Sequence, residues 1–471
     1  MEIQLEKIGT NKWQIKKLPE MKVEAVIYSK EELLDQIRND LSLVQLAQSA
    51  SLPNLLSPVV GMPDIHEGFG LPIGGVMAAD NLVSSGAVGM DINCGVRLLK
   101  TSLVFDPKRF NRDFLKIIIK RIEEVVPTGL GSRRKGGLPG GLSFEGVVID
   151  GLDYLLEKGY ATSDDLESCE EYGKITGAKM ENLSPQAIKR ANDELGTLGS
   201  GNHFMEIQVL EKIFDENLAK SFGLFEKQIC LMIHCGSRAL GQQTCLDYTD
   251  KFARVATKYG FTFPTRNLAS LPADSPEGQA YLSAMAAAVN FAFANRQLIT
   301  YQIRQVFSNL FPSEKPKLDL VYDVAHNIAK WETHRNKKVL VHRKGATRAL
   351  PAKHPQNPRK YLKTGQPAIV PGSMGTHSYV MVGLPAAEET FFSINHGAGR
   401  KMSRTEAQRT IKEADFEKTM AGVTYNKPFR VIADEAPQAY KDIDLVTETL
   451  VEAKIAKKIA QLRPLAVIKG D

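Results

Sequence analysis

The order of hydrophobic and polar residues along the chain predicts both strands and helices. Residues 22–28 alternate as a half-buried strand does. Ser29 and Glu32 then form a capping box. Behind it one amphipathic helix is predicted from apolar residues at helical spacing: Leu33, Leu34, Ile37, Leu41 and Val44. A further helix is predicted at about 107–125, with this apolar side: Phe110, Phe114, Ile117, Ile118 and Ile122.

The remaining elements continue this mixture. Ser184 and Pro185 are typical of the N-cap and first turn of a helix, which should end near Gly196. Helical patterns also cover 276–311 and 443–462, and short strands are predicted at 229–234, 338–342, 367–371, 379–383 and 391–395. Because no repeat or flexible linker interrupts them, we predict a single large mixed α/β domain spanning residues 1–471.

Composition narrows the class of protein. Hydrophobic residues make up 43% of the 471 and charged residues 24%, which excludes wholesale disorder and a fibrous repeat. The first residues lack the apolar stretch of a signal peptide, and the most apolar helical stretch, 284–294, is too short to span a membrane. The five cysteines form no CxxC pair, which argues against a disulfide framework. We therefore expect a cytoplasmic protein without membrane association.

Charge is unevenly distributed, although the net charge is only +6. Residues 333–387 contain no acidic side chain, whereas ten lysines and arginines lie between Arg335 and Lys363. Such a block repels itself unless an anion neutralises it, and a phosphate chain is a common anion of this kind. The alternative is a solvated basic face. We expect the block at 335–363, including Arg343 and Lys344, to bind a nucleic-acid backbone.

Side chains that ligate metals gather beside glycine-rich turns. The glycine-rich segment 61–95 ends in GMDINCG, where the Asp91 carboxylate and the Cys94 thiolate could reach one metal ion. Four histidines lie at junctions next to Gly, Asn or Cys: His203, His234, His326 and His396. Each alone could be structural, but together they predict a site for Mn²⁺, Zn²⁺, Fe²⁺ or Co²⁺ rather than Mg²⁺. A shared thiolate could bridge two such ions.

His396 lies in a different context, because HGAGRKMSR places Arg400 and Arg404 downstream of it. A neutral imidazole can attack phosphorus to give a phosphoramidate, and a nearby arginine would stabilise the developing charge. A histidine that caps a glycine turn is the structural alternative. The sequence contains no HExxH and no GxxxxGK[ST], so any nucleotide is held without a Walker-type loop.

With these segments in view, the chain resembles the RtcB family of RNA ligases over nearly its whole length. The resemblance rests on ordered motifs: MPDIHEGFGLPIGG, GAVGMDINCGVR, LGTLGSGNHFMEIQ, HCGSRALG, HNIAKWE, HRKGATRA, PGSMGTHSY, HGAGRKMSR, DEAPQAYK and VIKG. It implies an enzyme that uses GTP and two Mn²⁺ ions to join an RNA 3′-phosphate or 2′,3′-cyclic phosphate to a 5′-hydroxyl. Histidine-GMP and RNA 3′-pp-5′-G would be its intermediates, and tRNA splicing or RNA repair its task. The implied fold has packed mixed β-sheets surrounded by helices.

The resemblance also implies roles by position. His396 would be the guanylylated histidine. The two manganese ions would be held by Asp91, Cys94, His203, His234 and His326, with Cys94 bridging. Guanine and ribose contacts would map to Asn202, Phe204, Glu206, Ser373, Ser378, Tyr440 and Lys469, and phosphate contacts to Asn327 and Arg400. Asp64 matches an acid of the first motif without an implied role. RNA would be the partner, as tRNA halves or broken strands, together with an archease-type activator.

Three positions depart from the family pattern. Asn395 stands where many members have cysteine, His377 stands where alanine is common, and Asp471 follows the usual terminal glycine. His377 and Asp471 adjoin implied guanine contacts, so nucleotide preference is the property they would affect. The residues alone leave two other functions open. One is a dinuclear phosphoesterase or nuclease that needs no GTP, and the other is a non-catalytic RNA-binding protein that uses the basic block.

Overall fold

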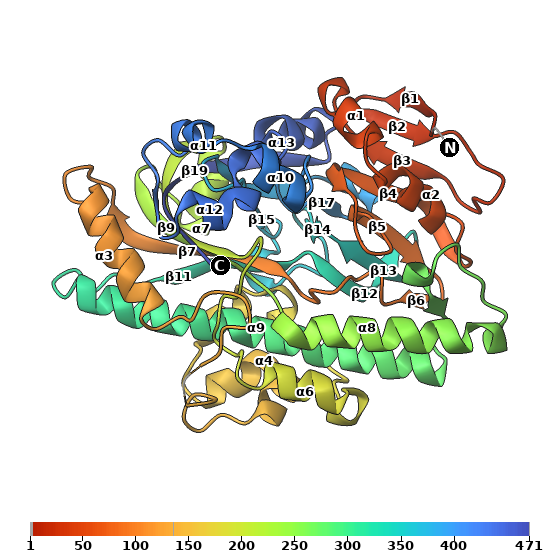
Figure 1. Cartoon of the computed structure of the whole chain (residues 1–471), viewed down its shortest axis with the longest axis horizontal. Helices are drawn as coiled ribbons and strands as arrows, with labels where there is room; N and C mark the ends of the chain where they lie inside the picture. Colours follow the sequence, from red (N-terminus) through yellow and green to blue (C-terminus); the bar gives the residue numbers. More distant parts are fainter. Residues whose placement is uncertain (1–2, 135, 471) are drawn as a thin grey trace.

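Two mixed β-sheets form the centre of the computed structural model, which describes residues 3–134 and 136–470 (Figure 1). The first sheet has seven strands in the order β1-β2-β3-β4-β5-β13-β12. Only β3 and β4 pair in parallel within it. Its strands are β1 (Leu5–Gly9), β2 (Lys12–Ile15), β3 (Ala25–Tyr28), β4 (Leu55–His66), β5 (Ile73–Ala79), β13 (Lys337–Lys344) and β12 (Asn327–His334).

The second sheet has eight strands, seven of them in the order β11-β7-β9-β8-β19-β16-β15 and β18 beside β19. They are β11 (Asp319–Ala325), β7 (Gly95–Val104), β9 (Gln228–Cys235), β8 (Phe204–Ile213), β19 (Ala456–Lys469), β16 (Ser378–Gly383), β15 (Ala368–Val370) and β18 (Thr424–Tyr425). Two small ladders pair β10 (Ser270–Leu271) with β6 (Val83–Ser84) and β14 (Ala346–Arg348) with β17 (Ser393–Asn395).

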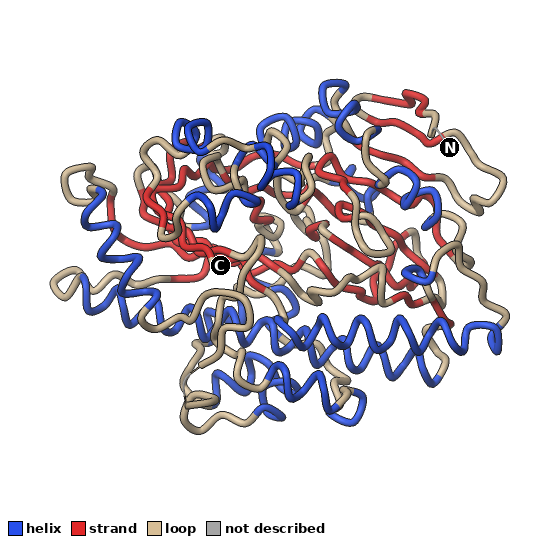
Figure 2. The backbone as a smooth tube through the Cα atoms, in the orientation of Figure 1, coloured by secondary structure: helices blue, strands red, loops and turns tan. Residues whose placement is uncertain are grey.

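Helices surround these sheets, as the blue segments of Figure 2 show. The long helix α9 (Pro276–Leu310) runs beside α8 (Arg238–Val255) along one side, with α4 (Phe144–Glu157) and α6 (Pro185–Ala191) beyond it (Figure 1). The other helices are α1 (Glu31–Arg38), α2 (Ser42–Ser49), α3 (Arg112–Glu123), α5 (Ser163–Glu167), α7 (Glu216–Phe222), α10 (Arg404–Thr410), α11 (Glu413–Thr419), α12 (Phe429–Ile432) and α13 (Ile443–Glu452). None of the helices in the described ranges is both long and apolar enough to cross a membrane.

The hydrophobic core consists of layers that follow the sheets. One face of the eight-stranded sheet packs against α9 through Ile207, Leu231 and Phe293. Apolar residues from both sheets, such as Val341 and Met381, share the cluster between them. Helices α1 and α2 cover the other face of the seven-stranded sheet. The predicted fold class, mixed α/β with packed sheets surrounded by helices, is confirmed.

Two of the predicted helices are wrong. Ser29 forms no capping box, because its hydroxyl donates to the Lys30 carbonyl (2.8 Å) and Lys30 is the N-cap. The single helix behind it is in fact α1 and α2, since Asp40 accepts from the Ser42 backbone N–H (2.6 Å) and starts a new helix. The helix predicted at 443–462 ends at Glu452, because the left-handed backbone of Lys454 (φ 58°) turns the chain into strand β19.

Other predicted elements are confirmed. Ser184 caps α6 by accepting from the Ala187 backbone N–H, with Pro185 in the first turn, although α6 ends at Ala191. The strand predicted at 229–234 is β9, and the helical pattern at 276–311 is the one helix α9. Helix α3 covers most of 107–125 and buries Ile118 and Ile122, but Ile117 is exposed because it lies on the solvent side.

Candidate active site

A cavity of about 380 Å³ opens where strand ends and loops from both sheets meet. Twelve of the predicted site residues line it: Asp91, Cys94, Asn202, Phe204, His234, His326, Asn327, Ser373, His396, Arg400, Tyr440 and Lys469. Three others do not: His203, Glu206 and Ser378. Residues more than 300 positions apart in the sequence therefore converge on one hollow.

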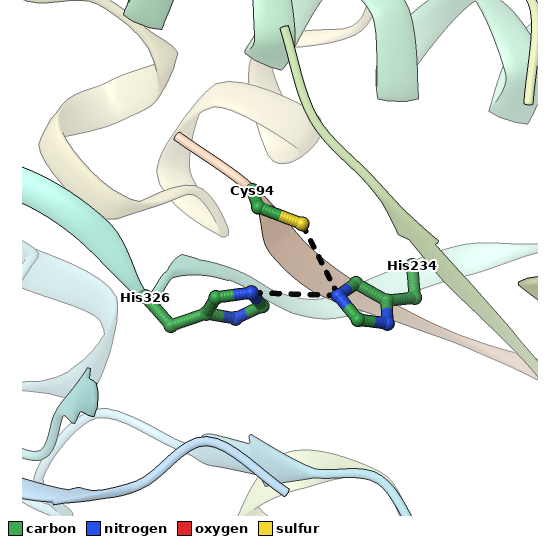
Figure 3. A group of neighbouring side chains, drawn as sticks. All are labelled: Cys94, His234 and His326. Atoms are coloured by element: carbon green, nitrogen blue, oxygen red, sulfur yellow. Dashed lines mark hydrogen bonds between the residues drawn. The ribbon is translucent and has the colours of Figure 1, made fainter. Parts of the chain in front are cut away.

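Two groups of metal-ligating atoms share the Cys94 sulfur. Cys94 Sγ lies 3.2 Å from His234 Nε2, which lies 3.4 Å from His326 Nε2 (Figure 3). On its other side Cys94 Sγ lies 3.4 Å from His203 Nε2, which lies 2.7 Å from Asp91 Oδ2. The first group offers a sulfur and two imidazoles, and the second offers the same sulfur, one imidazole and a carboxylate. These ligands suit two borderline cations such as Mn²⁺ or Zn²⁺. The shared thiol fits a bridging role.

The pKa values and hydrogen bonds of these ligands favour the binding of cations. Burial raises the pKa of the Cys94 thiol to about 12, so a cation is needed to stabilise its thiolate. The Asp91 side chain is 29% exposed, and although desolvation opposes this, His203 beside it holds its pKa at about 2. His203 Nδ1 donates to the Leu198 carbonyl (3.1 Å), which leaves Nε2 as the ligating atom.

Arg296 of helix α9 fixes the backbone next to two of the ligands, one in a turn and the other at the end of strand β9. Its Nη1 donates to the carbonyls of Asn93 and Cys235, both at 2.8 Å. These carbonyls belong to the residues next to Cys94 and His234. The fully buried guanidinium is held by Asp323 (2.8 Å), which also pairs with Arg97 (2.8 Å). The core helix thus sets the positions of both ligands.

His396 is held by a buried carboxylate. Its Nδ1 donates to Asp64 Oδ2 (2.7 Å), and the backbone N–H groups of His396 and Gly397 donate to the same oxygen at 3.0 and 3.2 Å. With Nδ1 protonated, Nε2 carries the free lone pair. The His396 and His326 ring centres are 4.8 Å apart, so the His396 ring lies beside the metal ligand His326. The role of Asp64 that sequence alone left open is therefore to orient His396.

Glu435 anchors the opposite part of the cavity wall, and sequence reasoning missed it. Its carboxylate pairs with Lys469 (3.1 Å) and Arg400 (3.3 Å) and accepts from the Tyr440 hydroxyl (2.5 Å). Although its own burial opposes this, Lys469 and Arg400 lower the pKa of Glu435. The only signal was its place in the motif DEAPQAYK, because an acid is not an obvious choice in a pocket for an anion.

Glu206 and Ser378 lie behind the wall rather than on it. Gln208 Nε2 donates to both, at 2.7 Å to Glu206 Oε2 and 3.1 Å to Ser378 Oγ. Burial raises the pKa of Glu206 to about 8. Of the departures from the family pattern, His377 pairs with Glu211 (3.1 Å), Asn395 donates to the Gly397 carbonyl (2.9 Å), and Asp471 lies outside the described residues.

The basic block at 335–363 does not form one surface. Arg343 is fully buried against Glu332, and Arg348 pairs with Glu170 (3.0 Å) and Glu171 (2.9 Å), so acids from elsewhere in the chain neutralise both. The expectation that Arg343 binds a phosphate backbone on the surface is therefore wrong. Lys344 is also buried and bonds the Phe69 carbonyl, but it lines the cavity. Burial lowers its pKa to about 7.

Taken together, these features are typical of an enzyme that acts on phosphates, because two ligand groups that share a sulfur adjoin an oriented imidazole in one open cavity. Comparison with known proteins identifies the family. The sequence model of the family described as tRNA-splicing ligase RtcB matches residues 45–470. The chain therefore belongs to the RtcB family and is an RNA ligase.

Individual relatives agree along their full lengths. The chain is 43% identical to the tRNA-splicing ligase RtcB of Thermococcus kodakarensis, with 99% of both chains covered. It is 43% identical to that of Nanoarchaeum equitans, with 100% of both covered. The RNA-splicing ligase RtcB of Mycobacterium tuberculosis is 41% identical and matches over all of its length and 91% of this chain.

Proposed function

We propose that the protein joins an RNA 3′-phosphate to a 5′-hydroxyl with GTP as cosubstrate, through a guanylylated His396. The observation that carries this proposal is the imidazole itself: Asp64 fixes Nδ1, and Nε2 is left free in the cavity. Family membership favours ligation over the phosphoesterase and the non-catalytic RNA-binding alternatives. The polar wall of Arg400, Tyr440, Lys469 and Glu435 is suited to a nucleotide.

Two Mn²⁺ ions would be held by the two groups that share Cys94, one by Asp91, Cys94 and His203 and the other by Cys94, His234 and His326. When bound, they would neutralise phosphate charge and hold reacting oxygens in place. Asn327, Arg400 and Lys344 would contact phosphates from the cavity wall. Phe204 and Asn202 would border the guanosine, with Glu206 and Ser378 behind them.

The first step would be attack of His396 Nε2 on the α-phosphorus of GTP. A P–N bond forms, the bond to the β-phosphate oxygen breaks, and pyrophosphate leaves. The His396 ring keeps its Nδ1 proton, which it donates to the Asp64 carboxylate. This carboxylate stabilises the positive charge that develops on the ring. An RNA 3′-phosphate oxygen then attacks the same phosphorus, the P–N bond breaks, and RNA 3′-pp-5′-G forms.

In the last step the 5′-hydroxyl of the second RNA end attacks the RNA 3′-phosphorus, loses its proton, and expels GMP. A 2′,3′-cyclic phosphate would first be opened by water to a 3′-phosphate. A second opening of about 470 Å³, bordered by Asp91, His203, Arg190 and Arg238, offers a separate approach for one of the two RNA ends. Two openings onto one ligand cluster support a reaction between two polynucleotide ends.

Incubation with GTP labelled at the α-phosphate and Mn²⁺ tests the proposal. We expect a label that stays with the denatured protein, resists base and is released by acid, as a phosphoramidate does. GTP labelled at the γ-phosphate should leave no label on the protein. A protein that ligates RNA without an α-labelled adduct would refute the histidine intermediate.

Asp64 should matter only for the step in which His396 is the nucleophile. We expect Asp64→Asn to slow adduct formation about 100-fold. A neutral amide orients the His396 ring less well than a carboxylate and stabilises its positive charge less. Sealing of supplied RNA 3′-pp-5′-G should be unaffected. Asp80→Asn, an exposed carboxylate at the end of β5, is the matched control. Equal loss in both reactions would mean that Asp64 merely supports the fold.

In the cell we propose tRNA splicing or RNA repair in the cytoplasm, with an archease-type protein as activator. The relatives carry splicing in their names, and this supports the first task. That residues 1–471 form a single domain stays a prediction. It can be checked by limited proteolysis, which should yield no stable fragment with its own cooperative unfolding transition.

A further inference from the structure

Two exposed aromatic side chains lie on a surface outside the cavity. Trp331 of strand β12 is 39% exposed and Tyr172 is 46% exposed. Lys338 Nζ lies 5.4 Å from the centre of the Trp331 ring, and the Tyr172 hydroxyl accepts from the Arg359 backbone N–H (3.3 Å). Trp331 lines a cleft of about 920 Å³ together with Glu171, the residue that precedes Tyr172 in the chain.

The cations of this cleft and of the basic block fall into two groups. Lys174 pairs with Asp150 and Asp153, and Lys330 pairs with Glu170 and Glu171, so these charges are neutralised. The other group is exposed and, among the described residues, forms no ion pair: Lys179, Lys337, Lys338, Lys353, Arg359, Lys360 and Lys363. Apart from Lys179, they belong to the exposed part of the basic block, which also includes Arg335, and their charge calls for an anionic partner.

The backbone that presents Tyr172 is in an unfavourable conformation. Glu171 and Tyr172 both have left-handed backbone angles, with φ of 51° and 55°. Consecutive non-glycine residues adopt this conformation only where their surroundings impose it, and such positions gather at functional sites. Here the ion pairs of Glu171 with Lys330 (3.1 Å) and Arg348 (2.9 Å) impose this backbone conformation. The exposed Tyr172 ring is therefore held in place rather than loose.

Strand β12 connects this surface with the cavity. It begins at Asn327, which lines the cavity, and Trp331 lies four residues further on. At about 3.3 Å per residue the two positions are about 13 Å apart, and an even separation puts their side chains on the same face of the strand. The cavity and this surface are therefore separated by about the span of a short length of RNA backbone.

We propose that this surface is a platform for single-stranded RNA, with bases stacked on Trp331 and Tyr172 and phosphates held by the unpaired cations. Stacking on aromatic side chains beside a basic groove is how proteins bind single strands without regard to sequence. The inference rests on the RNA ligase function and adds a second point of contact with the substrate. The enzyme binds the RNA at a second place, behind the end that reacts.

The test compares two RNAs that carry a 3′-phosphate, one a dinucleotide confined to the cavity and the other a longer single strand. Trp331→Ala should weaken binding of the longer RNA about tenfold and leave the dinucleotide unchanged. Trp331→Phe should restore most of the affinity. Lys338→Ala should lower the log-log salt slope for the longer RNA by about 0.7, whereas Trp331→Ala should not change it.

A second aromatic-lysine pair provides the matched control. Phe214 is 42% exposed, and Lys212 Nζ lies 4.8 Å from its ring centre, on strand β8 and the turn after it. Phe214→Ala should bind both RNAs like the parent. The platform is refuted if Trp331→Ala binds the longer RNA normally, or if Phe214→Ala weakens it equally. Adduct formation with GTP is measured in parallel, and its absence would refute the proposed mechanism without touching the affinities.

Discussion

The His396→Ala variant is expected to form no covalent adduct with GTP and to leave RNA 3′-phosphate ends unjoined. Both losses follow because, among the described residues, only the His396 imidazole is hydrogen-bonded to the Asp64 carboxylate, whereas His66 Nδ1 bonds the Asp64 backbone carbonyl. The variant should remain folded, since the His396 ring borders a cavity and its backbone N–H still donates to Asp64. Denaturing gels after incubation with α-labelled GTP measure the adduct, and a 5′-hydroxyl acceptor RNA measures ligation.

The same variant should still seal RNA that is supplied as 3′-pp-5′-G. This last step needs the bound metal ions and the phosphate contacts, which the substitution leaves in place. His354→Ala is the control, because His354 packs on Phe392 and does not line the cavity. If His396→Ala still carried an acid-labile GMP adduct, the nucleophile would be another histidine.

Cys94→Ser should lower the metal content of the protein and abolish ligation. Cys94 is the residue that both ligand groups contain, so this one substitution removes a ligand from each group. A serine hydroxyl does not ionise near neutral pH and is a poor bridging ligand for soft or borderline cations. Elemental analysis of the protein after equilibration with Mn²⁺ measures the effect directly, without reference to activity.

Cys245→Ser is the matched control for this loss. Cys245 is also buried, but its thiol donates to the Ser85 carbonyl (3.5 Å), a bond that a hydroxyl can make. It should retain full metal content and ligation. If Cys94→Ser bound as much metal as the parent, the two groups would not be a dinuclear site.

The metal ligands could be predicted because their own neighbours mark them. Cys94 lies in a glycine-flanked turn beside Asp91, and His234 ends a buried strand, so the sequence predicts both as metal ligands. The sequence could not show which atoms meet, because Cys94 and His326 are brought together by the pairing of β7 with β11, which ends at Gly95 and Ala325. The role of Asp64 could not be predicted, since its partner His396 lies 332 residues further along the chain. Glu435 was missed although its partners Arg400, Tyr440 and Lys469 lie within 35 residues of it.

Buried ion pairs and long-range strand pairing explain why the predictions for Arg343 and for residues 443–462 were wrong. Arg343 pairs with Glu332 on the neighbouring strand, a contact that a count of charges in one segment does not show. The helix predicted at 443–462 was favoured because Ile455, Ile459 and Leu462 recur at helical spacing. Pairing of β19 with β8 and β16 outweighs that local preference, so this segment is a strand.

The position of β19 in its sheet has a consequence for how the protein folds. Strand β8 (Phe204–Ile213) pairs on one side with β9, which follows it closely, and on the other with β19, more than 240 residues later. Until β19 is synthesised, β8 is therefore an open edge with unpaired backbone groups. Pairings of such long range form slowly. Nascent chains of this protein should depend on chaperones that shield this edge, and chains that lack β19 should aggregate rather than fold around a half-built sheet.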